Sequence, residues 1–349
     1  MNYSNVYIEA FGYELPPNVV TSADLEAKLV PLYNALHFKP GQLEAITGIY
    51  ERRWWDPDFP MRDGAVRAGQ KALAAAGRGV LEPPDIGMLI YGGVCRDQLE
   101  PATACAVAHG LGLGPETQIY DVSNACLGIL NGMVQIANAI ELGQIQAGMV
   151  VSCESARQIV TATIERLLTA GDMETFKKCI ATLTGGSGAV AVILTNAAHS
   201  SQGHQLVGGA IRSAAEHYQL CTWGPDTGIP ATMELVMETD SVGVLNNGVV
   251  LGIDTFQAFK KTLNWHAPDL DKIICHQVGA THQENILAAI GISKEKDFTT
   301  FPFLGNIGTV SLPITAAIAA EREFLTPGDK VGLLGIGSGL NCLMLGVSW

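Results

Sequence analysis

The sequence predicts an α/β protein with a large compact interior. Short apolar runs typical of strands alternate with longer stretches of helical periodicity, and this alternation continues through both halves of the chain. Hydrophobic residues make up 48% of the 349 residues and charged residues only 16%. This composition argues against a disordered chain, and the length favours two domains or one two-lobed unit.

The predicted elements follow a regular order. In the first half we expect strands at 86–93, 117–122, 147–154 and 188–196, and helices at 65–77 and 127–143. In the second half we expect helices at 254–265, 280–291 and 308–324, and strands at 272–277 and 330–339. The second half therefore resembles the first in the order of its elements, although hardly in its residues.

An internal duplication is one explanation of this order. Pairs of landmarks lie about 180 residues apart: Tyr91 with His276, Cys126 with Asn306, and Ser155 with Ser338. A chance alignment of alternating units gives similar offsets, so the duplication is a hypothesis. The polar, glycine-containing stretch 170–188 interrupts the hydrophobic pattern and predicts a boundary that divides the chain into residues 1–180 and 181–349.

Charge and cysteine usage narrow the classes of partner. The net charge of −13 disfavours nucleic acids and anionic membranes, which require clustered Lys and Arg. The sequence shows no signal-peptide pattern and no apolar run of about 18 residues, so we expect a cytoplasmic protein without a transmembrane segment. The eight cysteines form no CxxC pair, and the histidines lack metal-like spacing, so we expect neither a disulfide framework nor a metal site.

Cys126 is the cysteine whose local context suggests reactivity. It follows an extended run and begins a helix that carries no charged residue before Glu141. A thiol at a helix N-terminus lies near unpaired N–H groups and the positive end of the helix dipole, which lower its pKa. The alternative is a small core residue at a tight junction between strand and helix.

Three further segments place polar or flexible residues where α/β proteins build sites. His276 follows an apolar strand directly, and Asn306 lies in a glycine-flanked turn before another apolar helix. The run GIGSG brings Gly337 and Ser338 into a turn whose backbone can approach a ligand closely. Taken singly, a core histidine, a helix cap and a structural turn are the ordinary alternatives.

Together these segments resemble a known family. DVSNACLGIL, IICHQVGATHQ, GNIGTVSLPI and GIGSGLNC are similar to the nucleophile, histidine, asparagine and glycine-loop motifs of the ketoacyl-ACP synthase III branch of the thiolase superfamily. The resemblance spans the chain in order and spacing. It implies the thiolase fold, with duplicated βαβαβαββ halves in five layers, αβαβα. It also implies catalytic roles for Cys126, His276 and Asn306, with no cofactor and acyl-CoA as substrate.

Within that branch, VCRDQLEPATA resembles the OleA-type enzymes, which condense two fatty acyl-CoA molecules without decarboxylation. Removing an α-proton from a plain acyl chain requires a base. The resemblance assigns that role to Glu100, donated across a homodimer to the partner's site. A solvated loop carboxylate is the alternative. The resemblance also implies an oxyanion hole made by backbone N–H groups of Cys126 and of the loop at Gly337 and Ser338.

The segment GIYERRWW offers cations and aromatic rings for the phosphates and adenine of CoA. We expect Arg52, Arg53 and Trp54 to contribute, with a salt-bridged surface turn as the alternative.

Three functions remain open on the sequence. The first is non-decarboxylative Claisen condensation through an acyl-Cys126 intermediate. The second is a decarboxylative condensation or an acyl transfer to another acceptor. The third is a noncatalytic acyl-binding subunit, which would have no need to keep Cys126, His276 and Asn306 together. Gly279 replaces the asparagine usual after the histidine motif, which argues against an ordinary role in fatty-acid initiation.

Overall fold

The computed structural model describes residues 1–77, 81–225 and 235–349. Within these residues nine strands form one large sheet, in the order β11-β12-β13-β8-β1-β7-β6-β4-β5. Their bounds are β1 Tyr7–Glu14, β4 Met88–Gly92, β5 Gln118–Val122, β6 Ala147–Glu154, β7 Gly188–Thr195, β8 His204–Ser213, β11 Lys272–Cys275, β12 Lys330–Gly337 and β13 Asn341–Ser348. The strands predicted from sequence are confirmed, with ends that shift by one or two residues.

The large sheet consists of two sets of strands that meet at a short seam. Strands β1 and β8 pair only at Tyr7 with Gln205 and at Ile8 with His204. On one side β4 and β6 are parallel and β7 pairs antiparallel with both β6 and β1. On the other side β11 and β12 are parallel and β13 pairs antiparallel with both β12 and β8. The pairing pattern is thus repeated.

The edge strand of the first set also has a counterpart. Strand β5 lies parallel to β4, and in the second set a single parallel bridge joins Ile273 of β11 to Asp297. Strand β7 pairs only with β1 and β6, which belong to the first set. We therefore propose that the boundary between the two halves follows Thr195, rather than residue 180.

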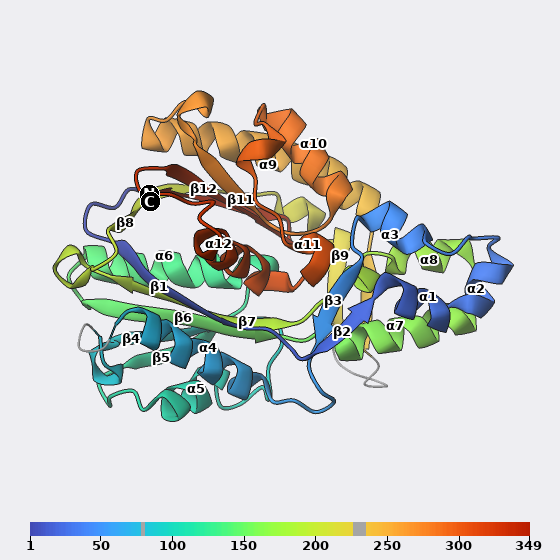
Figure 1. Cartoon of the computed structure of the whole chain (residues 1–349), viewed down its shortest axis with the longest axis horizontal. Helices are drawn as coiled ribbons and strands as arrows, with labels where there is room; N and C mark the ends of the chain where they lie inside the picture. Colours follow the sequence, from blue (N-terminus) through green and yellow to red (C-terminus); the bar gives the residue numbers. More distant parts are fainter. Residues whose placement is uncertain (78–80, 226–234) are drawn as a thin grey trace.

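Helices lie in three layers around the two sets of strands (Figure 1). Helices α4 (Met61–Ala75) and α5 (Thr103–Leu111) cover one outer face, and α9 (Ser241–Leu263) and α10 (Ala280–Ile290) cover the other. Between the sets lie α6 (Gly128–Glu141) and α12 (Ser311–Glu321). This order is the five-layer αβαβα arrangement that the sequence resemblance implies, which confirms the predicted fold class.

The two central helices bury most of their surface because a sheet lies on each side of them, although α6 keeps Asn131, Gln135 and Asn138 along one polar stripe. In α12 every residue from Ser311 to Ala319 is buried. In α6 the buried positions include Ile129, Met133 and Ile136, and the helix carries no charge before Glu141. The start of α6 contacts the segment that leads into α12, because Ile129 N donates to Thr309 Oγ1 at 2.8 Å.

A smaller region extends from one end of the layers (Figure 1). It contains the following elements: α1 Ser22–Lys28, α2 Val30–Ala35, α3 Gln42–Thr47, α7 Arg157–Ala170, α8 Met173–Cys179, and the short sheets β2 Asn18–Thr21 with β3 Glu51–Trp54 and β9 Cys221–Pro225 with β10 Leu235–Thr239. The sequence analysis predicted none of these helices. Four of the five are only six or seven residues long, too short for a helical period to stand out, whereas α7 carries Ile159, Val160, Ile164 and Leu167 at helical spacing, a signal that could have found it. A search of the described residues for a helix long and apolar enough to span a membrane finds none.

Candidate active site

A cavity of about 180 Å³ lies at the carboxyl ends of β11 and β12. Its lining brings together Cys126, His276 and Asn306, which come from three separate parts of the chain. Gly337 and Ser338 line it as well. Much of the remaining wall is apolar and is contributed by α9, α10, β12 and β13. The cavity therefore combines a small polar group of residues with a hydrophobic interior.

Cys126 lies on a sharp turn between β5 and α6. Residues Ala125–Leu127 form a single 3₁₀ turn, and Ala125 has a positive φ of 44°, which is unfavourable for a residue with a side chain. Opposite the turn, a Cβ at position 337 would lie only 3.3 Å from Cys126 N. Glycine at that position thus lets the end of β12 approach the backbone of the nucleophile.

The Cys126 thiol is protonated in the resting site. Burial raises its pKa to about 12, and Cys221 and Glu154 add to the rise. The expectation of a lowered pKa is therefore wrong, because burial of the thiol penalises its charged form. A thiolate forms here only when a base takes the proton.

His276 continues β11, and its backbone N–H donates to Leu334 O at 3.0 Å. Burial, together with the neighbouring His282, lowers the pKa of His276 to about 4. The imidazole is accordingly neutral at physiological pH. A neutral imidazole can accept the proton of a thiol or donate its own N–H to a carbonyl oxygen.

Asn306 is held with its amide in a defined orientation. The backbone N–H of Asn306 donates to Thr184 O at 2.9 Å, and its backbone carbonyl accepts from Gly186 N at 2.9 Å. The side-chain Oδ1 accepts from Gly308 N at 3.1 Å. Since the amide oxygen is engaged in this way, the amide nitrogen is the group that remains to donate to a ligand in the cavity.

An asparagine chain connects the nucleophile turn to the Ser338 loop. Asn124 Nδ2 donates to Asn131 Oδ1 at 2.7 Å, and Asn341 Nδ2 donates to Asn124 Oδ1 at 3.3 Å. Asn341 Nδ2 also donates to Ser338 O at 3.4 Å. The chain joins the two backbone segments that the sequence resemblance assigns to the oxyanion hole. Sequence reasoning missed this role of Asn124 and Asn341.

Glu100 lies away from the cavity of its own chain. It is exposed at the tip of the loop between β4 and α5, beside Leu99, which is 94% exposed. The structure of a single chain does not bring Glu100 together with Cys126.

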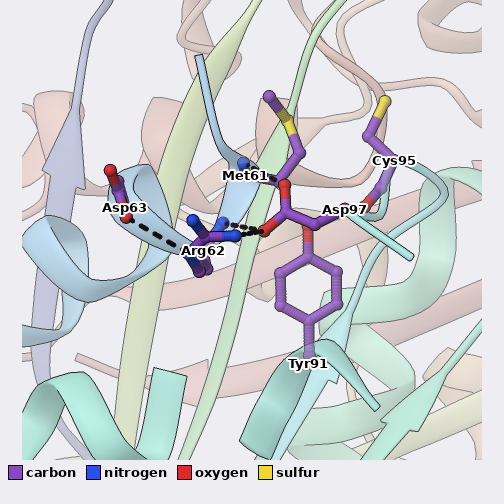
Figure 2. A network of polar contacts seen from close by, with 6 residues as sticks. All are labelled: Met61, Arg62, Asp63, Tyr91, Cys95 and Asp97. Carbon is purple, nitrogen blue, oxygen red and sulfur yellow. Dashed lines mark hydrogen bonds and ion pairs between the residues drawn. The ribbon is translucent and has the colours of Figure 1, made fainter. Parts of the chain in front are cut away.

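The loop that carries Glu100 is nevertheless firmly held at its base. Figure 2 shows the Asp97 carboxylate facing the start of α4, where it accepts from Met61 N at 2.7 Å and Arg62 N at 3.1 Å. The Tyr91 hydroxyl donates to Cys95 O at 2.7 Å. Only the tip of the loop extends outward.

The buried carboxylate of Glu154 anchors the first residues of the same loop. It accepts from Val94 N at 2.9 Å and from Cys95 N at 3.2 Å. Burial raises the pKa of Glu154. Sequence reasoning did not single out this residue, because a glutamate at the end of an apolar strand gives no indication of its distant partners.

The expectation for CoA binding by Arg52 and Trp54 is wrong in this structure. Arg52 is fully buried, and its guanidinium donates to Ser22 Oγ at 3.1 Å and Leu183 O at 3.3 Å. Trp54 is also buried, and its indole donates to Gly185 O at 3.2 Å. Arg53 is half-buried and donates to Pro16 O at 3.3 Å. The alternation along β3 turns Arg52 and Trp54 inward.

Across residues 1–77, 81–225 and 235–349, no three His, Cys, Asp or Glu side chains gather in a way that could hold a metal ion.

The comparisons with known proteins agree with this geometry. The family model described as 3-Oxoacyl-[acyl-carrier-protein (ACP)] synthase III C terminal matches residues 261–349, the part of the chain that contains His276, Asn306 and Ser338. An acyl-CoA:acyl-CoA alkyltransferase of Shewanella oneidensis is 52% identical over 353 residues, covering 100% of both proteins.

More distant relatives preserve the whole architecture. A second acyl-CoA:acyl-CoA alkyltransferase, from Xanthomonas campestris, is 37% identical over 351 residues and is also covered completely. The crystal structure of a cysteine-to-serine variant of Xanthomonas campestris OleA with bound lauric acid and lauroyl-CoA matches with a TM-score of 0.91 at 37% identity, over 99% of this chain and 100% of that one. The chain therefore belongs to the acyl-CoA:acyl-CoA alkyltransferase (OleA) family, within the ketoacyl-ACP synthase III branch of the thiolase superfamily.

Proposed function

We propose that this acyltransferase joins two fatty acyl-CoA molecules by a Claisen condensation without decarboxylation and releases a 2-alkyl-3-ketoacyl-CoA. The observation that carries the proposal is the meeting of Cys126, His276 and Asn306 around one largely apolar cavity. The names of the Shewanella and Xanthomonas relatives support the same chemistry.

In the first half-reaction the nucleophile takes up an acyl group. The Cys126 sulfur attacks the carbonyl carbon of the first acyl-CoA as its proton passes to His276, so no free thiolate has to form beforehand. N–H groups of Cys126 and Ser338 stabilise the oxyanion, and the bond to the CoA sulfur breaks. The CoA thiolate takes the proton back from His276 and leaves as free CoA.

In the second half-reaction a carbon–carbon bond forms. The thioester oxygen of a second acyl-CoA accepts hydrogen bonds from His276 and the Asn306 amide, which stabilises the enolate. Glu100 of the partner subunit removes the α-proton, and the resulting carbanion attacks the acyl group on Cys126. The Cys126 sulfur leaves, and the proton held by Glu100 restores the thiol in net balance.

The position of Glu100 supports a homodimer with the base donated across its interface. Within its own chain Glu100 lies outside the cavity, yet its loop is anchored by Asp97 and Glu154. A rigid loop with an exposed leucine and glutamate at its tip suits a segment that docks into a second copy of the chain. No resident cofactor enters this mechanism.

The experiment follows each half-reaction separately. Cys126→Ser should prevent formation of the acyl-enzyme thioester seen by intact-mass spectrometry. Glu100→Gln should still acylate Cys126 but form no condensed product. Normal condensation by Glu100→Gln would remove Glu100 from the role of base, while condensation by wild-type protein only after addition of a malonyl thioester would support a decarboxylative enzyme instead.

A further inference from the structure

The cavity extends from Cys126 beneath α9. Side chains of Val244, Leu245 and Val249 on α9 line it, together with Ile286 of α10 and Ile336 of β12. This wall suits a chain of methylene groups, which requires no hydrogen bonds. The following inference rests on the proposed function, because it identifies this space as the channel for the acyl chain held on Cys126.

Two glycines, Gly248 and Gly252, also line the channel. They lie four residues apart in α9, so they share one face of the helix. A glycine in a helix interior costs about 1 kcal/mol relative to alanine, and two of them within one turn therefore call for an explanation outside the helix itself.

Glycines in other helices are explained by close packing. A Cβ at Gly132 of α6 would lie 2.4 Å from Val150 Cγ2, and one at Gly69 of α4 would lie 2.9 Å from Leu111 Cδ1, with further atoms close behind. At Gly248 the single near atom is Ile336 Cδ1 at 3.1 Å, itself the end of a side chain in the cavity wall. Packing would accept a side chain at Gly248, and the channel would lose the space.

Gly252 lies in a slightly tighter position. A Cβ there would lie 2.7 Å from Ile286 Cδ1, which is again the flexible end of a side chain that lines the cavity. The absence of side chains at these two positions therefore leaves room in the channel without being required by the contact between α9 and its neighbours.

We propose that Gly248, with Gly252 one turn further along, determines the length of acyl chain that Cys126 accepts. Each methylene group buried in an apolar site contributes about 0.8 kcal/mol, which corresponds to roughly a fourfold change in kcat/KM. Valine at position 248 adds three carbon atoms to the wall. The preferred acyl chain should become shorter by about three carbons, and kcat/KM for the longest accepted chain should fall roughly fiftyfold.

The test measures the acylation of Cys126 with a homologous series of saturated acyl-CoAs, by single-turnover intact-mass spectrometry. Wild-type protein is compared with Gly248→Ala and Gly248→Val. The control is Val250→Leu, which adds bulk on the outer face of the same helix, where Val250 is 60% exposed. In the Gly248 variants the rate of acylation by long-chain acyl-CoAs should fall, and the rate with short chains should stay within about twofold of wild type. The control should follow the wild-type dependence on chain length.

The outcomes separate this inference from the proposed function. If wild-type protein forms no acyl-enzyme with any chain, the proposed function fails. If it does, but Gly248→Val shows the wild-type chain profile, the channel assignment is overturned. Should Gly248→Val fail to fold, Gly248→Ala provides the test, because alanine favours the helix and this variant is expected to fold. An unchanged dependence on chain length in Gly248→Ala contradicts the inference, and a shift to shorter chains supports it.

Discussion

The side-chain amides of Asn341 and Asn124 are joined by a hydrogen bond of 3.3 Å, although the residues are 217 positions apart. This contact connects the turn of the Cys126 nucleophile with the loop of Ser338. It joins the two backbone segments that we propose as the oxyanion hole.

Asn341→Ala should therefore slow the acylation of Cys126 by about tenfold, less than the loss of a direct oxyanion donor, because it displaces the donors without removing them. Stopped-flow release of CoA in a single turnover measures this step. Asn285→Ala is the matched control, since Asn285 is exposed and donates only within its own helix. Equal rates for Asn341→Ala and wild-type protein would rule out this role for the asparagine chain.

The pKa of His276 predicts an unusual pH profile. Because burial lowers this pKa from 6.5 to about 4, the imidazole stays neutral where an ordinary histidine becomes protonated. Protonated imidazole cannot accept the thiol proton, so the acylation rate should stay level as the pH falls past 6.5 and decline only near 4. Circular dichroism at each pH confirms that the fold persists. A midpoint near 6.5 would contradict the neutral, buried imidazole.

Arg52→Ala tests the structural role of the buried guanidinium. The substitution removes hydrogen bonds to Ser22 and Leu183 and leaves a cavity, which together should cost about 2–4 kcal/mol in the free energy of unfolding. Urea denaturation measures the loss. The KM for acyl-CoA in the folded variant should stay unchanged, and a large rise in KM without loss of stability would restore Arg52 to the CoA site.

Donation of Glu100 across a dimer predicts complementation. Cys126→Ser and Glu100→Gln homodimers should both be inactive in condensation, yet a mixed dimer contains one site with both groups intact. Random exchange of subunits should therefore recover about a quarter of the wild-type activity. Mixing Cys126→Ser with the double variant, which carries both substitutions, is the control and should recover none. Complete inactivity of the first mixture would refute the donation.

The three residues that meet in the cavity could be predicted from sequence. His276 directly follows β11, Cys126 lies in the turn before α6 and Asn306 in the turn before α12, and motif resemblance linked them before any geometry was known. The contacts that hold them could not be predicted: Glu154 reaches back to Val94 and Cys95 across about 60 residues, which no local pattern reveals.

Two errors have definite physical causes. The segment GIYERRWW around Arg52 has the composition of a surface segment, but residues from earlier and later in the chain cover the Arg52 side chain. The helix expected to begin at residue 254 begins at Ser241. Asn246, Asn247 and Gly248 are poor helix formers, and they obscure the helical spacing of the apolar residues beside them.

The most direct test of the central claim supplies purified protein with one fatty acyl-CoA, labelled at its carbonyl carbon, as the sole substrate. Mass spectrometry should find a single condensed β-keto thioester that retains both labelled carbons, with one CoA released for each pair of acyl-CoA molecules consumed. Acylated Cys126 without any condensed product, until a malonyl thioester is added, would contradict the account.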